Sequence, residues 1–352
     1  MQNCIIGWDI GGAHLKAAVI SPSSEILAIY LLPCPLWKGL DKLEEAVREI
    51  LADGLFPVKT HVLTMTGELV DLFDGRDEGV KQILSAMRTY LPNQRLVVYS
   101  GRDGLVEIED VVESHYANIA SANWLASATL AAQQVGNGLF VDIGSTTTDI
   151  LLLDNGKVLA EGYTDYQRLV SQELVYTGIV RTAVMSVAQS VHDGDNEIGL
   201  MAEYFATMAD VYRLTGELNE RHDHCDTADG AEKTVAASAR RLARMIGSDY
   251  QENDLPRWQR FAENVRGQQT DRIQQACVRQ LSRLTIPYDI PLIGAGIGSY
   301  LVRKIAANLG LPYINYSGLF VIRAAKSAYS VNDCAPAVAV ACLAVQCLNN
   351  LD

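Results

Sequence analysis

Two short segments place an acidic residue in front of small turn residues, in the same order. Asp9-Ile10-Gly11-Gly12 is the first, and Asp142-Ile143-Gly144-Ser145 is the second. Glycines allow a tight turn whose backbone N–H groups converge on one point, which makes a site for an anion. Hydroxyl side chains in the second segment add donors suited to phosphate oxygens. We therefore predict two phosphate-binding turns, built from Gly11 and Gly12 and from Gly144, Ser145, Thr146, Thr147 and Thr148.

Charged side chains next to these turns complete the expected site. Asp9 and Asp142 would hold Mg²⁺, directly or through its waters, because magnesium at a phosphate usually takes one or two carboxylates. Lys16 follows the first turn and would neutralise a phosphate. An ordinary hairpin explains either turn alone, but the presence of two copies favours phosphate binding. A third turn, with Gly294 and Gly296, suits either an anion or tight strand–helix packing.

Similar strands must position the first two turns. Strands are predicted over 4–9, 15–21 and 25–32, and again over 139–142, 149–153 and 157–162, with a tight turn at Asn155-Gly156. Asp142 lies 133 residues after Asp9. A repeat of this period indicates a duplicated lobe rather than a solenoid. We expect the two acids to face each other across a cleft between the lobes.

The other elements follow from hydrophobic periodicity. Helices are predicted over 40–53, 78–91, 117–134, 299–309 and 335–348, and strands over 61–66, 95–99, 289–293 and 311–315. Residues 175–283 are predicted to be mostly helical, with a polar connection at 221–229 and core positions along Met201–Leu214. The expected domains are lobe I (1–125, with the last helix, 335–352, packed back on it) and lobe II (126–334). Lobe II would carry a helical insertion over 175–285 and a strand–turn–helix over 289–310.

Composition excludes several classes of protein. The 352 residues include 29 Lys+Arg and 42 Asp+Glu, a formal net charge of −13, which argues against a nucleic-acid surface and against anchoring to anionic lipid. Seven scattered cysteines without a CxxC pair indicate reduced thiols in the cytoplasm. His222, His224 and Cys225 lack the spacing of a structural zinc site. We expect neither a signal peptide nor a membrane span, and the oligomeric state stays open.

The duplicated meanders resemble the acetate kinase/sugar kinase/Hsp70/actin superfamily. That resemblance implies a two-lobed α/β fold of the actin-like ATPase (ribonuclease H-like) type with a ligand cleft between the lobes. Finer motifs, from about residue 4 to about residue 345, resemble the hydantoinase/oxoprolinase-related "tetrahydromethanopterin-linked one-carbon transfer pathway protein" family. These motifs are Trp8–Ala18, Thr64–Leu69, Ser121–Trp124, Asp142–Ile150, Glu173–Thr182 and Thr227–Gly230.

The family resemblance implies a transferase of methanofuran or methylofuran biosynthesis. Such an enzyme joins an aminomethylfuran-methyl diphosphate to the phenol of a tyramine- or tyrosine-derived acceptor and releases diphosphate. A base would take the phenol proton, with Glu68, Asp165, Glu173, Asp210 and Asp229 as candidates; each has an equally simple structural role. Asn123, Arg168 and Arg181 are candidate substrate contacts, although the arginines would serve equally well in structural salt bridges.

Two other functions remain open at this stage. One is an ATP-dependent kinase or amide hydrolase, as elsewhere in the superfamily, in which case ATP would bind. The other is a nucleotide-gated clamp without enzymatic activity, whose lobes close to signal to a partner.

Overall fold

A computed structural model describes residues 4–54, 56–284, 289–323 and 327–349. The chain divides into two compact units. Unit 1 comprises Met1–Phe140, Leu151–Gln167 and Ile314–Asp352, and unit 2 comprises Val141–Ile150 and Arg168–Tyr313.

Unit 1 is built on a six-stranded sheet in the order β3-β2-β1-β4-β5-β6. Strands β1 (Cys4–Ile10), β2 (His14–Ile20) and β3 (Ile26–Pro33) form an antiparallel meander, which confirms the first predicted meander. Strands β4 (Val58–Met65) and β5 (Arg95–Tyr99) continue the sheet in parallel with β1, and β6 (Leu105–Glu107) is antiparallel to β5. Because β1 and β4 are parallel, the carboxyl ends of both strands lie at the same edge of the sheet.

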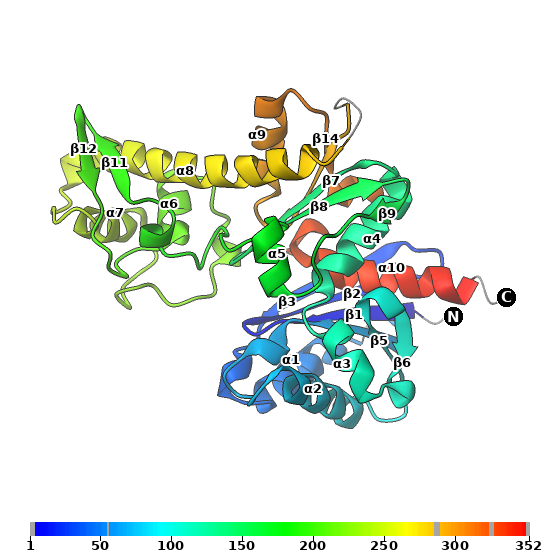
Figure 1. Ribbon diagram of the computed structural model, residues 1–352. Coiled ribbons are helices and arrows are strands. Elements are labelled where there is room, and N and C mark those ends of the chain that lie inside the picture. Colours follow the sequence, from blue (N-terminus) through cyan, green and yellow to red (C-terminus); the bar gives the residue numbers. More distant parts are fainter. Residues whose placement is uncertain (1–3, 55, 285–288, 324–326, 350–352) are drawn as a thin grey trace. The chain divides into compact units, whose positions relative to one another are not determined.

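Helices cover both faces of this sheet (Figure 1). On one face, α1 (Asp41–Ala52) and α2 (Arg76–Tyr90) enclose a core that includes Ile6 and Trp8. On the other face, α10 (Ala335–Asn349) packs against β1, β2 and β4. The contact is close because β1 carries Gly7, where an added Cβ would lie 2.0 Å from the carbonyl oxygen of Ala337.

The helix predicted over 117–134 is interrupted. The structure has α3 (Glu113–Ile119) and α4 (Asn123–Val135), and Ser121 between them has φ = 52°. A left-handed residue cannot continue a right-handed helix. The chain therefore turns, and Asn123 becomes the first residue of a new helix, which packs against α10.

A second sheet has the order β10-β8-β7-β13-β14, with β9 paired to β8. Its strands are β7 (Gly138–Ile143), β8 (Thr148–Asp154), β9 (Lys157–Val158), β10 (Leu174–Val175), β13 (Leu292–Ala295) and β14 (Tyr313–Asn315). The second meander and its turn are confirmed, with positive φ at Asn155 and Gly156. However, β9 ends at Val158 rather than at 162. Leu159 still donates its N–H to the carbonyl of Leu152, and the chain then continues to α5 (Asp165–Ser171).

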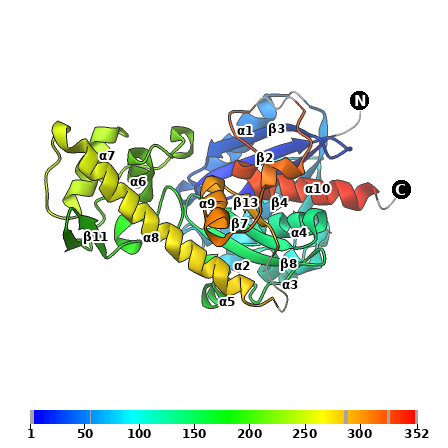
Figure 2. The same ribbon diagram turned by 90° about the horizontal axis from the view of Figure 1, so that it is seen from above.

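The insertion in unit 2 is less helical than predicted. It contains α6 (Met208–Leu214), α7 (Val235–Arg244) and α8 (Leu255–Leu281), but also a hairpin of β11 (Ser190–Asp193) and β12 (Asn196–Gly199). Of the Met and aromatic positions expected in the core along 201–214, Met208 and Tyr212 on α6 are buried. Met201 is 45% exposed and Tyr204 is 50% exposed, and both precede the helix. Figure 2 shows α6, α7 and β11 gathered at one end of α8, with α9 (Ser299–Leu309) near the other end.

No helix within the described residues is both long and apolar enough to cross a membrane. The longest, α8, carries charged side chains along its length.

Candidate functional site

The first predicted turn is a closed four-residue loop in unit 1. The N–H of Gly11 donates to the carbonyl of His14 over 3.0 Å. The carbonyls of Gly12 and Ala13 accept hydrogen bonds from residues 36 and 34. In the described part of the chain, no acceptor takes the N–H of Gly12 or Ala13. Hydrogen bonds to its carbonyl groups thus hold the turn in place, while the N–H groups of Gly12 and Ala13 stay available for an anion.

The second predicted turn, in unit 2, has the same construction. The N–H of Gly144 donates to the carbonyl of Thr147 over 2.9 Å. The carbonyl of Ser145 accepts from the N–H groups of residues 180 and 181. Within the described ranges, no acceptor takes the N–H of Ser145 or Thr146.

The two turns correspond residue for residue. Gly144 and Thr147 lie 133 positions after Gly11 and His14, and the same pair of atoms closes each turn. The repeat seen in the sequence is therefore a repeat of backbone geometry. That Asp9 and Asp142 face each other stays a prediction.

Asp9 is held tightly at the end of β1. Its side chain is 2% exposed; Oδ2 lies 3.2 Å from Lys16 Nζ, and Oδ1 accepts from Asn123 Nδ2 at 3.3 Å. Thr64 pairs in register with Asp9 from β4, and its buried Oγ1 has no hydrogen-bond partner among the described residues. Sequence reasoning missed Thr64, although it opens one of the family-like motifs. The structure thus brings four predicted or newly found polar residues together: Asp9, Lys16, Thr64 and Asn123.

Lys16→Ala is expected to reduce pyrophosphate affinity of the folded protein at least 10-fold, because a cation beside the first turn is removed. It should also lower the free energy of unfolding by about 1–2 kcal/mol, because the buried carboxylate of Asp9 loses a partly exposed partner. Calorimetric titration of pyrophosphate, well below the melting temperature, separates the two effects. A folded variant that binds pyrophosphate like the wild type would show that Lys16 serves the fold alone.

The second turn is enclosed by glycines from two other segments. Gly296 has φ = 76°, and an added Cβ there would lie 2.3 Å from Asp142 Oδ1 and 2.3 Å from the carbonyl oxygen of Ile143. A Cβ on Gly178 would lie 2.5 Å from the backbone of Ser145. The third turn therefore meets the second at Asp142. Gly294 instead packs against Tyr313 and Val302, and Gly178 is a site residue that sequence reasoning did not single out.

The residues near the second turn fit a magnesium ion. Asp142 is half-buried, and the neighbouring groups are hydroxyls and carbonyls, which are the hard oxygen donors that Mg²⁺ prefers. No group of three or more His, Cys, Asp or Glu side chains able to hold a metal occurs in the described part of the chain. This composition suits an ion held by one or two carboxylates together with phosphate oxygens, rather than an all-protein cage.

Four of the five base candidates are engaged with arginine. Asp165 pairs with Arg76 at 2.7 Å, and Glu173 is fully buried and pairs with Arg283 at 3.2 Å. Asp210 is buried and accepts from Arg241 at 2.8 Å. Asp229 pairs with Arg241 and Arg244. A hydrogen bond from the N–H of Ala231 and these arginines outweigh its desolvation and hold its pKa below the ordinary value.

Glu68 is the exception. It is 1% exposed, its Oε1 accepts from Ser121 Oγ at 2.7 Å, and its buried Oε2 has no partner among the described residues. Burial is the main cause that raises the pKa of its carboxyl. Enclosure, rather than the raised pKa, argues against Glu68 as the base, because a base must come within hydrogen-bond distance of the bound substrate.

The two predicted arginine contacts differ sharply. Arg168 is buried and makes a short ion pair with Asp149, and this contact gives it a structural role. Arg181 is exposed and makes no ion pair with any described residue. The backbone N–H of Arg181 donates to the carbonyl of Ser145. The backbone of Arg181 therefore lies against the second turn, while the charge of its side chain acts on Tyr204 and Cys225. A ligand contact by this side chain stays a prediction.

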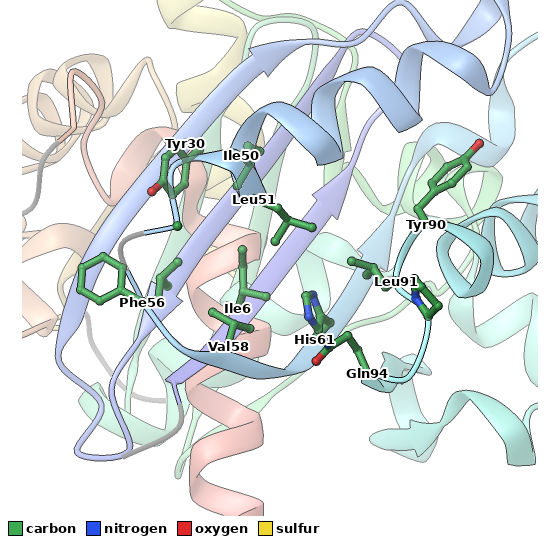
Figure 3. Close-up of a pocket in the computed structure, with 13 residues that line it drawn as sticks. Ile6, Tyr30, Ile50, Leu51, Phe56, Val58, His61, Tyr90, Leu91 and Gln94 are labelled. Carbon is green, nitrogen blue, oxygen red and sulfur yellow. The ribbon is translucent and has the colours of Figure 1, made fainter. Parts of the chain in front are cut away.

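A cavity of about 330 Å³ lies elsewhere in unit 1, between the end of α1, the start of β4 and segment 90–94 (Figure 3). Ile6 lines it, and because side chains alternate along β1, this is the face opposite Asp9. His61 also lines it and accepts from Trp8 Nε1 at 3.1 Å. Burial lowers the pKa of His61 to about 4, so the ring is neutral at neutral pH.

Acidification is expected to destabilise the protein through His61. The unfolded chain takes up this proton near pH 6.5, whereas the folded chain does so only near pH 4. Stability from this group is therefore complete above about pH 6.5 and is lost as the pH falls to about 4, by roughly 3 kcal/mol. Urea unfolding between pH 7 and 4 should show a smaller loss in His61→Gln than in the wild type, with exposed His192→Gln as the control. If the wild type and the two variants lost the same free energy of unfolding between pH 7 and 4, the prediction would be wrong.

The sheets and turns described above are those of the actin-like ATPase fold. A nucleotide-free structure of acetone carboxylase superposes with a TM-score of 0.52, covering 98% of this chain and 70% of that one at 10% identity. A ROK family glucokinase from Streptomyces griseus gives a TM-score of 0.48, covering 98% and 100% at 15% identity.

Residues 59–337 match the hydantoinase/oxoprolinase family, and the chain belongs to this family. A relative from Methanocaldococcus jannaschii, named (4-{4-[2-(gamma-L-glutamylamino)ethyl]phenoxymethyl}furan-2-yl)methanamine synthase, is 33% identical over 251 residues, which cover 71% of this chain and 73% of the relative. A protein of the same name from Methanococcus vannielii is 34% identical over 113 residues, covering 32% and 50%. The resemblance predicted from the motifs is confirmed.

Proposed function

We propose that this chain is a transferase that joins a furan-methyl diphosphate to a phenol, forming an aryl ether and releasing diphosphate. Its acceptor would be a tyramine- or tyrosine-derived phenol, and the reaction would serve methanofuran or methylofuran biosynthesis in the cytoplasm. The duplicated turn is the observation that carries the proposal: each copy follows a strand whose next-to-last residue is aspartate, and each keeps backbone donors available. The name of the relatives describes a product in which an aminomethylfuran is joined to a phenol through a phenoxymethyl ether. The diphosphate leaving group is part of our proposal.

The reaction exchanges one C–O bond for another at the furfuryl carbon. The bond between this carbon and the diphosphate oxygen breaks, and its electron pair leaves with the diphosphate. The furan ring stabilises the positive charge that develops at the carbon, so the bond to the diphosphate can break before the new bond forms. A lone pair of the phenol oxygen then forms the ether bond, and the phenol loses its proton. No oxidant and no nucleotide is needed.

The residues around the turns suit the departing diphosphate. Negative charge builds on its oxygens as the bond breaks, and fixed N–H donors and cations stabilise that charge without reorganising. We assign this role to the N–H groups of Gly12, Ser145 and Thr146, with Lys16 and Arg181. Asp9 and Asp142 would hold Mg²⁺, which supplies further positive charge at the diphosphate when it is bound.

The phenol proton needs no dedicated strong base in this scheme. Four candidate acids are engaged with arginines, and Glu68 is enclosed. Because the bond to the diphosphate breaks before the ether bond forms, the phenol O–H becomes acidic as its oxygen bonds to the electron-poor carbon. We propose that an oxygen of the departing diphosphate, or water, accepts the proton.

Incubation with the furan diphosphate and a panel of phenols, with and without ATP, tests the proposal. We expect one pyrophosphate released per ether formed, with Mg²⁺ and without ATP. A double variant, Gly12→Val with Ser145→Pro, serves as the inactive control, because it blocks or removes donors in both turns. Consumption of ATP with no ether formed would contradict the proposal and favour a kinase or amide hydrolase. Tight nucleotide binding without turnover would favour a non-enzymatic clamp.

A further inference from the structure

We infer that Glu68 is a positioning residue: through Ser121 it fixes the start of α4, so that Asn123 can hold the carboxylate of Asp9. The activity part of this inference rests on the proposed function, whereas its structural part does not. The chain of contacts links three segments that are distant in sequence, namely the short helix at Gly67–Leu69, the α3–α4 corner and the end of β1.

The first contact anchors Glu68 itself. An added Cβ on Gly79 would lie 2.6 Å from the carbonyl oxygen of Glu68, so α2 packs directly on its backbone. With the backbone fixed, the side chain accepts a hydrogen bond from the hydroxyl of Ser121 at 2.7 Å. Both residues are buried, so water competes little for this hydrogen bond.

The second step is the corner at Ser121. Its φ of 52° is uncommon for a residue other than glycine and costs free energy unless surrounding contacts support it. The hydrogen bond that the Ser121 hydroxyl donates to Glu68 is such a contact. Two residues later α4 begins, so the geometry at Ser121 sets where the first turn of α4 starts and where its side chains point.

The third contact reaches the candidate site. Asn123 is the first residue of α4, and its Nδ2 donates to Asp9 Oδ1, while Lys16 lies against Oδ2. Each carboxylate oxygen thus has one partner, and together they fix the orientation of the Asp9 side chain. Loss of the Asn123 contact would leave that side chain free to rotate about its last bond.

Burial argues against the other role for Glu68. A base must come within hydrogen-bond distance of the phenol, and the Oε2 of Glu68 is enclosed by protein atoms. Arg76 favours the charged form of this carboxyl and Asp165 disfavours it, but desolvation outweighs both and raises its pKa. A carboxyl accepts the hydroxyl hydrogen of Ser121 in either protonation state, so the positioning role does not depend on the charge of Glu68.

The test compares Glu68→Gln with Glu68→Ala. Glutamine keeps an oxygen that accepts from Ser121, so we expect pyrophosphate affinity and turnover within about 3-fold of wild type and an unchanged pH–rate profile. Alanine removes the contact, and we expect at least a 10-fold loss of pyrophosphate affinity. Ser121→Ala should resemble Glu68→Ala. Ser127→Ala is the matched control, because this buried hydroxyl lies on α4, the helix of Asn123, without a partner among the described residues. We expect it to behave like the wild type.

A double variant keeps the test independent of the proposed function. If the contacts act as one chain, Asn123→Ala should add little to Glu68→Ala, both in pyrophosphate affinity and in urea unfolding, which needs no ligand. Additive effects in unfolding would overturn the inference, as would a Glu68→Ala protein that binds pyrophosphate normally. Glu68→Gln as inactive as Glu68→Ala, with one limb of the pH profile lost, would make Glu68 the base instead. If the wild type makes no ether but the Glu68 and Asn123 variants are non-additive in unfolding, the proposed function is wrong and the positioning role of Glu68 stands.

Discussion

Gly296→Ala should abolish pyrophosphate binding while leaving most of the fold in place. The new methyl group would lie 2.3 Å from both Asp142 Oδ1 and the carbonyl oxygen of Ile143, far inside contact distance. Because Ile143 belongs to a central strand, the least costly response is displacement of Asp142 and of the turn that follows it. A positive φ of 76° adds strain of about 1–2 kcal/mol for any residue with a Cβ. We expect at least a 100-fold loss of pyrophosphate affinity, the size typical when a charge-stabilising element is lost.

Gly310→Ala separates backbone strain from the clash. Gly310 ends α9 with φ = 68°, but nothing lies within 4 Å of an added Cβ. This variant should therefore lose about 1 kcal/mol of stability and keep its pyrophosphate affinity. Calorimetry and urea unfolding of both variants make the comparison. Similar binding by Gly296→Ala and the wild type would show that the third turn only packs and does not shape the anion site.

Asp142→Asn is expected to abolish Mg²⁺-dependent turnover without unfolding the protein. The substitution is nearly isosteric, so packing is preserved, but it removes the charge that a hard divalent cation needs. We expect about a 10²-fold loss of rate or more, together with loss of any increase in pyrophosphate affinity that Mg²⁺ gives to the wild type.

Asp195→Asn, on the exposed β11–β12 turn, is the matched control and should change neither quantity. Steady-state rates and titration of pyrophosphate with and without Mg²⁺ provide the readout. Normal rates and unchanged Mg²⁺ linkage in Asp142→Asn would show that Asp142 is only a turn residue.

Local pattern was enough to predict the parts of the fold that local geometry determines. Both meanders, the Asn155-Gly156 turn and the two closed loops are set by residues within a few positions of each other. The apolar periodicity of α1 and α2 likewise depends on one face of each helix. Such features appear in the sequence because the same residues both form and stabilise them.

Long-range contacts account for what the sequence could not predict. The helix break at Ser121 depends on Glu68, which is 53 positions away. The residues on either side of Ser121 favour a helix and do not indicate the break. Gly178 is required because its segment crosses the backbone of Ser145, a proximity that exists only after folding. Glu68 and Asp165 are equivalent acids in the sequence, and only burial and the position of Arg76 separate them.

The most direct test follows the phenol oxygen. With tyramine carrying ¹⁸O in its hydroxyl group, the furan diphosphate and Mg²⁺ but no ATP, a displacement at the furfuryl carbon places the label in the ether and none in the released pyrophosphate. Mass spectrometry of both products distinguishes the outcomes. We predict complete retention of ¹⁸O in the ether. Label in a phosphate ester of the phenol, or no product unless ATP is added and consumed, would contradict the account.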